Sequence, residues 1–235
     1  MFAPLPLPQL DQNARTLVTD AVFNHLQQQV LALALPPGTK ISEVEVAKQL
    51  GVSRQPVRDA FYRLSKLGFL DIRPQRATMV SLISPKAVLQ ARFIRNALEV
   101  ETVRTAVTAL TDDDLAALRD LIEQQRAAMA KRDKESFHTL DDQFHREICT
   151  RAGLGFTWEL IAENKGHMDR VRMLSLSFAS QDAFHDHEKI LAALEARDID
   201  GAAQAMRVHL ARILDQIDRI QADHGELFEP QTGHS

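Results

Sequence analysis

The chain has 235 residues, of which 45% are hydrophobic and 26% charged, and its formal net charge at pH 7 is −4. This length is enough for two domains that each have their own core. No apolar run approaches the roughly 20 residues that a membrane-spanning helix needs. The first residues lack the basic and apolar regions of a secretion signal. The single cysteine, Cys149, excludes an intramolecular disulfide, so we expect a cytoplasmic protein with no membrane segment.

Charge is distributed unevenly along the chain. Residues 1–84 contain 9 Lys and Arg against 6 Asp and Glu, whereas the remainder contains 19 against 26. A local basic surface can collect phosphates even when the whole chain is acidic. The first third of the chain is therefore the part in which a nucleic-acid contact is most plausible.

The N-terminal third opens with helical patterns. Residues 1–12 are rich in proline, and we expect them to form a flexible tail. Apolar residues recur at helical spacing over residues 14–34, and "PPG" at residues 36–38 ends that helix. Ser42 followed by Glu45 is a capping-box pattern, which predicts a second, short helix with the sequence "EVEVAKQL".

A tight turn and a third helix follow. Gly51 ends the short helix, and Ser53 is a candidate N-cap for the next one, which places Val57 and Phe61 on its apolar face. The runs "FLDIR" and "TMVSL" then predict a small β-hairpin. Helix, short helix, turn, helix and hairpin is the order of a winged helix-turn-helix domain, which we predict over residues 13–82.

The start of the third helix carries side chains that suit DNA. Because the apolar face points to the core, the polar residues of the first turns face solvent. There an arginine can donate to guanine, a glutamine can pair with adenine, and a serine hydroxyl with the helix amides can hold phosphate. Arginines at the hairpin tip can contact the DNA backbone or minor groove. The alternative interpretation is a solvated basic surface without a ligand. The predicted DNA contacts are Ser53, Arg54, Gln55, Arg58, Arg73 and Arg76.

The segment "LPPGTKISEVEVAKQLGVSRQPVRDAFYRLSKLGFLDIRPQRATMVS" contains PPG, an S-E-x-x-x-A helix and GVSR-x-PVR-x-A. With these motifs, residues 14–82 resemble the DNA-binding domain of GntR-family transcriptional regulators. Three positions depart from the pattern of that family. Leu33 stands where a glycine is frequent, Ala77 replaces the glycine of an Arg-Gly wing tip, and Val44 replaces a DNA-contacting arginine of many relatives.

The remainder of the chain is helical in pattern. Six helices are predicted, at residues 85–110, 112–131, 133–152, 155–178, 181–196 and 199–222. They predict a mainly α protein whose C-terminal domain, residues 85–222, is an all-α six-helix bundle. Asp198 or Asp200 is expected to begin the last helix. Residues 223–235 have little to bury, and we expect a second flexible tail there.

Four residues of the helical part form a metal-ligand pattern. Asp141 and His145 are four residues apart on one predicted helix, so they share a face. His187 lies 11 residues before Asp198 and His209 lies 11 residues after it, so a helical hairpin turning there brings the two imidazoles together. One carboxylate and three imidazoles suit zinc, nickel, manganese or iron. Spacing alone also fits an exposed pair of side chains, Asp141 and His145, on one helix and two unrelated histidines elsewhere.

The helical part contains R-x-x-L-E from Arg95, D-x-x-x-H from Asp141, H-x-x-I-x-x-A from His187 and A-M-x-x-H ending at His209. With these motifs it resembles the FCD ligand-binding domain of the FadR subgroup of GntR regulators. The resemblance implies a divalent metal ion, zinc before the others, held by Asp141, His145, His187 and His209. It also implies a homodimer and a small organic acid effector whose carboxylate meets the metal and Arg95. Six predicted helices resemble the VanR-like branch of that subgroup.

We therefore expect a homodimeric repressor that binds a palindromic operator and is controlled by an organic acid at a metal-containing pocket. Two alternatives remain open, a metal-dependent hydrolase that uses a free metal position and a sensor of the metal ion itself. Arg95 has an alternative role in a salt bridge to Glu99, four residues further along the helix. Cys149 is either a thiol near the metal or a buried structural residue.

Overall fold

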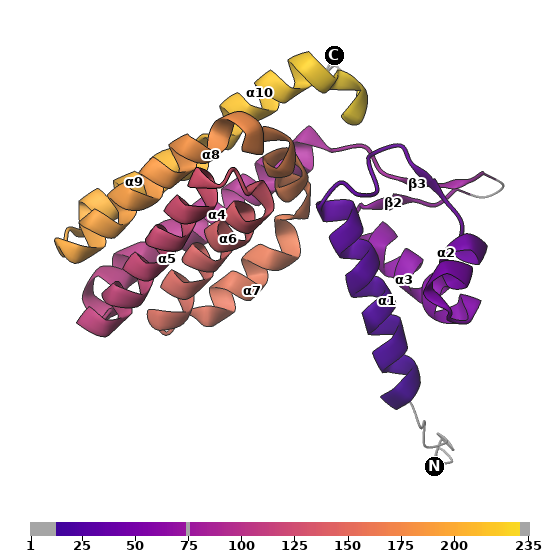
Figure 1. The fold of residues 1–235 in the computed structure, drawn as a ribbon, viewed down its shortest axis with the longest axis horizontal. Helices are drawn as coiled ribbons and strands as arrows, with labels where there is room; N and C mark the ends of the chain where they lie inside the picture. Colours follow the sequence, from indigo (N-terminus) through magenta and orange to yellow (C-terminus); the bar gives the residue numbers. More distant parts are fainter. Residues whose placement is uncertain (1–12, 74–75, 231–235) are drawn as a thin grey trace, which may run out of the picture. The chain divides into compact units, whose positions relative to one another are not determined.

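The computed structural model describes residues 13–73 and 76–230 (Figure 1). The chain divides into two compact units, Met1–Leu82 and Ile83–Ser235. The N-terminal tail expected at residues 1–12 lies outside the described residues. No helix in the described part is long and apolar enough to cross a membrane.

The first unit has the element order of a winged helix-turn-helix domain (Figure 1). Its elements are α1 (Asn13–Leu31), β1 (Lys40–Ile41), α2 (Glu43–Leu50), α3 (Arg54–Lys66), β2 (Leu70–Asp71) and β3 (Thr78–Val80). The predicted hairpin consists of β2 and β3, which pair antiparallel with Leu70 opposite Val80. Strand β1 pairs with the other edge of β3. It was not predicted, because a two-residue strand has no measurable alternation.

The core of the first unit lies between α1, α2 and α3. Val57, Phe61 and Leu64 of α3 are at most 1% exposed and pack in one apolar cluster with side chains of α1. The turn from α2 to α3 passes through Gly51, whose φ of 65° is in the left-handed region that favours glycine. Ser53 is the N-cap of α3, but its side chain makes no capping hydrogen bond. Its hydroxyl therefore does not cap the helix.

The turn after α1 contains a strained residue. Leu33 has a φ of 60°, a left-handed conformation that costs a non-glycine residue roughly 1–2 kcal/mol. A glycine adopts this conformation freely. Leucine instead of glycine at position 33 therefore makes the folded state less stable.

The second unit is helical, apart from one isolated β-bridge among its described residues. Its helices are α4 (Pro85–Ala109), α5 (Asp112–Ala130), α6 (Lys134–Arg151), α7 (Gly155–Asn164), α8 (Gly166–Glu195), α9 (Ile199–Ala211), α10 (Ile213–His224) and the 3-10 helix η1 (Gly225–Leu227). The all-α class predicted from the sequence is confirmed.

The division into helices differs from the prediction in three places. The helix expected over residues 155–178 is broken just before Gly166, where α8 begins, because glycine is a poor helix former. α8 then continues through residues 179–180, where a break was expected. Arg212 separates α9 from α10 while keeping nearly helical angles, φ −59° and ψ −25°. The described part of this unit thus has seven α-helices instead of six, and the helix count no longer supports the VanR-like branch.

The C-terminal segment is not the free tail that was expected from residue 223. Phe228 is only 4% exposed and lies beside Ile83 in a parallel bridge. The amide of Ile83 donates to the Leu227 carbonyl at 2.8 Å, and the amide of Glu229 donates to the Ile83 carbonyl at 2.9 Å. Two apolar residues after a glycine are too short a pattern to predict this docking. The last residues of the predicted tail lie outside the described part.

The main core of the second unit lies among α4, α5, α6, α8 and α9. Leu118 of α5, Phe144 of α6 and Leu194 of α8 are completely buried in it. A smaller apolar cluster joins the start of α4 to α8 and α10. This packing holds α6, α8 and α9 in place, and these three helices carry the polar cluster at the centre of the unit.

Candidate metal centre and DNA-contacting helix

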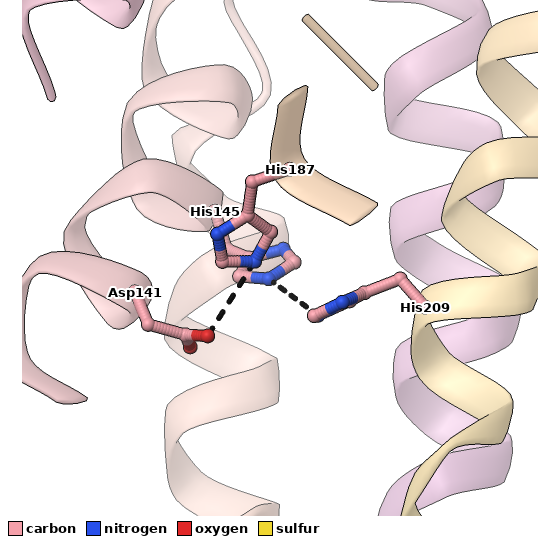
Figure 2. Close-up of side chains that lie close together, drawn as sticks. All are labelled: Asp141, His145, His187 and His209. Carbon is pink, nitrogen blue, oxygen red and sulfur yellow. Dashed lines mark hydrogen bonds and ion pairs between the residues drawn. The ribbon is translucent and has the colours of Figure 1, made fainter. Parts of the chain in front are cut away.

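Four side chains converge inside the second unit (Figure 2). Asp141 and His145 come from one face of α6, His187 comes from α8 and His209 from α9. One possible ligand atom from each residue lies within 4.8 Å of the others, and none of the four residues is more than 8% exposed. The rings of His187 and His209 have centroids 4.6 Å apart. They meet because α8 and α9 pack side by side around a turn at Asp198, the N-cap of α9.

A buried glutamine determines which nitrogen of His187 is free. Gln125 donates from its side-chain Nε2 to the Leu140 carbonyl at 3.1 Å, which turns its amide oxygen toward His187. That oxygen lies 2.8 Å from His187 Nδ1, so Nδ1 carries the proton and donates it. The lone pair of His187 is then on Nε2, 3.4 Å from Asp141 Oδ1.

A carboxylate faces Nδ1 of each of the other two imidazoles, although neither nitrogen makes a hydrogen bond of good geometry with a described residue. Glu99 Oε2 lies 2.6 Å from His145 Nδ1, and Asp186 Oδ2 lies 3.9 Å from His209 Nδ1. Each carboxylate favours a proton on the Nδ1 that faces it, which leaves the lone pair on Nε2. The Nε2 atoms of His145 and His209 are 3.1 Å apart. Three imidazole lone pairs therefore point to one place.

The cluster contains acceptors that lack donors. Asp141 Oδ1 and His187 Nε2 are buried and have no hydrogen-bond partner within the described part of the chain. Burial, reinforced by the neighbouring histidines, lowers the pKa of His187 and His209 well below the usual range, so protonation does not supply the missing donors. An unsatisfied buried polar atom costs roughly 1–3 kcal/mol. A divalent cation bound by one carboxylate and three neutral imidazoles removes this cost, so the donor set fits a metal ion.

A cavity of about 40 Å³ adjoins Asp141 and His209. Three arginines from different parts of the fold line it, Arg95 of α4, Arg172 of α8 and Arg212 between α9 and α10. Burial, with the charge of Arg95 nearby, lowers the pKa of Arg172 to about 9, so this side chain is still a cation at neutral pH. Three guanidinium groups on one small cavity favour an anionic occupant.

Arg95 lines this cavity and also makes the salt bridge that was its alternative role. Its Nε and Nη2 donate to the two Glu99 oxygens at 2.5 and 3.2 Å, and both residues are 2% exposed. Its Nη1 donates to Met168 Sδ at 3.6 Å, a weak acceptor. Burial would raise the pKa of Glu99, but Arg95 and His145 outweigh it and hold that pKa well below the usual range. Glu99 is therefore a charged link from a cavity arginine to a candidate metal ligand.

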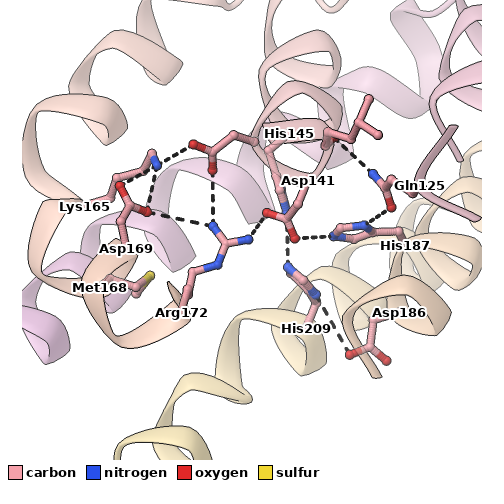
Figure 3. Close-up of polar contacts among 12 residues, drawn as sticks. Gln125, Asp141, His145, Lys165, Met168, Asp169, Arg172, Asp186, His187 and His209 are labelled. Carbon is pink, nitrogen blue, oxygen red and sulfur yellow. Dashed lines mark hydrogen bonds and ion pairs between the residues drawn. The ribbon is translucent and has the colours of Figure 1, made fainter. Parts of the chain in front are cut away.

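Arg172 connects the cluster to further acidic residues (Figure 3). It donates to Asp141 and, at 3.2 Å, to Asp142. Lys165 Nζ donates to Asp142 at 2.6 Å and to both oxygens of Asp169 at 2.8 and 2.7 Å. These aspartates already have cationic partners, so the grouping of Asp142 and Asp169 with a nearby histidine needs no metal ion for neutrality.

The single cysteine is a buried structural residue. Cys149 is 1% exposed, and burial raises the pKa of its thiol to about 11. A thiol that keeps its proton at neutral pH is a poor metal ligand and a poor nucleophile. The structural interpretation of Cys149 therefore fits better than a role at the metal.

The first turns of α3 present polar side chains to solvent. The exposed ones are Ser53, Arg54, Gln55 and Arg58. Glu43 Oε2 lies 3.5 Å from Arg54 Nη2 and 3.3 Å from Arg58 Nε, and Gln55 donates to Asp59 at 2.8 Å. Exposed pairs of this kind contribute at most about 1 kcal/mol each, so bases or phosphates can replace them.

The two remaining predicted DNA contacts lie in the connection between β2 and β3. Arg73 and Arg76 stand on either side of residues 74–75, and both are exposed. The Arg76 amide donates to the Arg73 carbonyl at 3.2 Å. The Arg73 guanidinium lies 2.7 Å from Asp71 Oδ2, another exposed pair. Both side chains thus occupy the tip of the hairpin, as a wing contact requires.

A winged helix-turn-helix unit joined to a helical unit with an internal polar cavity defines a class of proteins, the two-domain DNA-binding regulators. The chain belongs to the GntR family of this class. Residues 18–80 match the family of bacterial regulatory proteins named gntR, and residues 90–212 match the FCD domain. The family resemblance inferred from the sequence is thereby confirmed.

The relatives are transcriptional regulators. The HTH-type transcriptional repressor RspR of Escherichia coli (strain K12) is 33% identical over 216 residues, which cover 91% of this chain and 95% of that protein. An HTH-type regulator in an unstable DNA locus of Streptomyces ambofaciens is 36% identical over 219 residues, 92% of this chain and 91% of that protein. The solved structure of E. coli McbR/YncC is 29% identical, has a TM-score of 0.71 and covers 88% of this chain and 98% of its own. The protein is therefore a DNA-binding transcriptional regulator with a C-terminal ligand-binding domain, and its relatives are regulators and not enzymes.

Proposed function

We propose that the protein is a repressor whose affinity for its operator is controlled by a small organic acid bound beside a metal ion in the FCD domain. The observation that carries this proposal is the buried cluster of Asp141 and three histidines, whose acceptors lack donors and which adjoins an arginine-lined cavity. The winged helix of the same chain provides the DNA-binding function.

The metal ion would be held by Asp141, His145, His187 and His209. Zinc suits one oxygen and three nitrogen ligands best, and nickel, manganese and iron also accept this set. When bound, such an ion acts as a Lewis acid that attracts a carboxylate oxygen to a free coordination position. The chain's own contribution is to orient the imidazoles and to place Arg95 and Arg172 where a carboxylate can accept from them.

The charges around the cavity favour an effector with one negative charge. Nine charged side chains no more than 33% exposed surround the cluster and the cavity: Arg95, Lys165, Arg172, Arg212, Glu99, Asp141, Asp142, Asp169 and Asp186. Four cations against five carboxylates leave one net negative charge, and a divalent ion turns this into one net positive charge. Buried charges need neutralisation, so a monocarboxylate completes the site better than a neutral ligand or a dianion.

DNA reading is assigned to the exposed start of α3, with Arg54, Gln55 and Arg58 reaching base edges and Ser53 holding phosphate. A homodimer would place two such helices on the half-sites of a palindromic operator. An effector that binds one arrangement of the dimer better shifts the population away from the DNA-binding one. A typical coupling of about 1–3 kcal/mol changes operator affinity about 5- to 150-fold.

The hydrolase alternative finds little support in the surroundings of the cluster. A hydrolytic metal site needs a carboxylate or a lysine free to take a proton from water. Glu99 is instead paired with Arg95 and Asp186 with Arg212, each through two hydrogen bonds. Because both carboxylates accept from an arginine, neither is free to take a proton from water.

The direct test is selection of genomic DNA fragments by the purified protein at fixed salt, with zinc and after removal of metal by a chelator. We expect one enriched palindromic site. We also expect organic acids that the products of the neighbouring genes make or consume to weaken binding only when the metal is present. Enrichment of no sequence in either condition would refute the proposal. Affinity that follows zinc alone and ignores every acid would instead identify a sensor of the metal ion.

A further inference from the structure

Each arginine of the cavity is connected to a different candidate metal ligand, one directly and two through an intervening carboxylate. Arg172 donates directly to Asp141 (Figure 3). Arg95 holds Glu99 through two hydrogen bonds, and Glu99 Oε2 lies 2.6 Å from His145 Nδ1. All of these side chains are buried or nearly buried. Their interactions are therefore screened little by water.

The third arginine has a similar arrangement, but its carboxylate lies beyond hydrogen-bond distance of the histidine. Arg212 donates to the two Asp186 oxygens at 2.5 and 3.0 Å, and Asp186 Oδ2 lies 3.9 Å from His209 Nδ1. The fourth ligand differs, because the neutral Gln125 holds His187 and does not line the cavity. Three of the four ligands are thus connected to the place where an anion would bind, and His187 is not.

We propose that Glu99 and Asp186 are positioning residues that make the metal ion and an anionic effector bind cooperatively, an inference that rests on the proposed function. An anion in the cavity takes donors from the arginines, and Arg95 Nη1 is the most available because its present acceptor is a thioether sulfur. Glu99 is then less neutralised by Arg95, and its charge, 2.6 Å from His145 Nδ1, polarises that imidazole more strongly. His145 Nε2 becomes the better metal ligand. By linkage, the metal strengthens binding of the anion by the same factor.

The variant Glu99→Gln tests this link, because glutamine keeps the shape and can still accept from His145 but lacks the charge. Zinc affinity is measured by competition with a chelating dye in sodium acetate, and in sodium chloride of equal ionic strength with acetamide as a neutral analogue. In the wild-type chain we expect acetate to raise zinc affinity about 5- to 150-fold over acetamide. In Glu99→Gln we expect this ratio to be lost. Asp186→Asn should reduce the ratio independently through His209.

The matched control is Gln125→Met, which removes the acceptor for His187 Nδ1 without touching a cavity arginine. We expect zinc affinity to fall about 10- to 100-fold in both solutions while the ratio between them stays as in the wild type. A wild-type chain that binds zinc equally in acetate and acetamide overturns the inference, as does an unchanged ratio in Glu99→Gln. A wild-type chain that binds no zinc at all overturns the proposed metal pocket instead.

A separate observation concerns the C-terminal segment, which joins the cavity to the linker, the short stretch of residues 81–85 between the two predicted domains. Ile213 and Gln216, in the first turn of α10, line the cavity. Further along α10, Ile217 and Ile220 pack in one buried cluster with Ile83. Ile83 follows directly after the last residue of the DNA-binding unit and is completely buried. One helix, α10, therefore contacts both the cavity and Ile83, the first residue of the second unit.

Hydrogen bonds hold this connection at its far end. Two backbone hydrogen bonds tie the chain after α10 to Ile83. The Ile83 amide donates to the Leu227 carbonyl at 2.8 Å, and the Glu229 amide donates to the Ile83 carbonyl at 2.9 Å. The next amide, that of Ser84, donates to His167 Nδ1 on α8 at 3.3 Å. We infer that residues 213–229 form a strap that transmits the occupancy of the cavity to the linker, an inference that also rests on the proposed function.

Hydrogen–deuterium exchange of the full chain, with and without zinc plus sodium acetate, tests the strap. In the wild type we expect the ligands to change exchange rates at residues 83–88 and 213–224 together. In Phe228→Ala we expect the change to persist at 213–224 and to be lost at 83–88, whereas Leu214→Ala, at a half-exposed position of α10, should behave as the wild type. Equal responses of residues 83–88 in Phe228→Ala and wild type overturn the strap. Zinc binding, measured separately, shows whether the proposed pocket itself has failed.

Discussion

Replacing His187 by alanine is expected to abolish tight binding of a divalent cation and the stability that the cation confers. His187 Nε2 is a buried nitrogen that has no hydrogen-bond partner among the described residues, and Gln125 fixes its lone pair toward Asp141. Zinc at about 1,000 times its Kd stabilises a folded chain by about 4 kcal/mol. For a unit of this size that raises the Tm by roughly 8–16 °C. Calorimetry of chelator-treated protein, with and without added zinc, should show this rise in the wild type and not in His187→Ala.

The control for this experiment is His185→Ala. His185 lies on the same helix two residues earlier, but its side chain is 51% exposed and its ionic partner is Glu188, at 3.0 Å. Its removal should leave metal content and the zinc-induced rise in Tm unchanged. If His187→Ala retained one zinc per chain at wild-type affinity, the four-ligand site would be wrong.

The elements that the sequence predicted well are those whose ends depend on neighbours in the chain. Ser42 does accept from the amides of Val44 and Glu45, and Asp198 does begin α9 by accepting from Gly201. Such caps are local, so they can be read without knowing the fold. Strand β1 could not be predicted in this way, because two residues become a strand only through the partner strand opposite them.

The long helix α8 shows the limit of local rules in the second unit. A break was expected near residue 179, yet Ala179 is 8% exposed, and Leu176 and Phe184 on either side of it pack in the apolar core, so packing carries the helix through this point. The C-terminal segment likewise depends on a contact with a residue far away in the sequence, which local rules do not predict. Phe228 is buried because Ile83, far away in the sequence, provides its partner.

The candidate ligands and their supporting residues differ in how far the sequence could reveal them. Asp141 with His145, and His187 with His209, follow from helical spacing and from symmetry about a turn. The partner of His187, Gln125, is 62 positions away and obeys no spacing rule. Asp186 and Arg212 meet across 26 positions for the same reason, that two helices happen to cross there. Outer contacts of a site are set by packing, which a single sequence does not display.

Replacing Arg58 by alanine is expected to weaken specific operator binding about 5- to 150-fold, equivalent to about 1–3 kcal/mol. Arg58 stands on the exposed face of α3, with its side chain 56% exposed and Glu43 as its one ionic partner among the described residues. A surface pair of this kind is weak, so the free protein keeps the guanidinium available for a guanine edge. Anisotropy titrations with operator and with a scrambled duplex, at several salt concentrations, measure the effect.

The control is Arg63→Ala, on the same helix but with a structural task. Arg63 donates to Asp20 at 2.6 Å and stacks 3.9 Å from the ring centroid of Phe23, so its loss should lower stability and leave specificity intact. The scrambled duplex then separates two roles for Arg58. If Arg58 reads a base, affinity falls for the operator far more than for the scrambled duplex. If it holds a phosphate, both fall together and the salt dependence loses a slope of about 1. Unchanged affinity for both duplexes would remove Arg58 from the interface, and the neighbouring Arg54, which shares Glu43, would be the next arginine to replace.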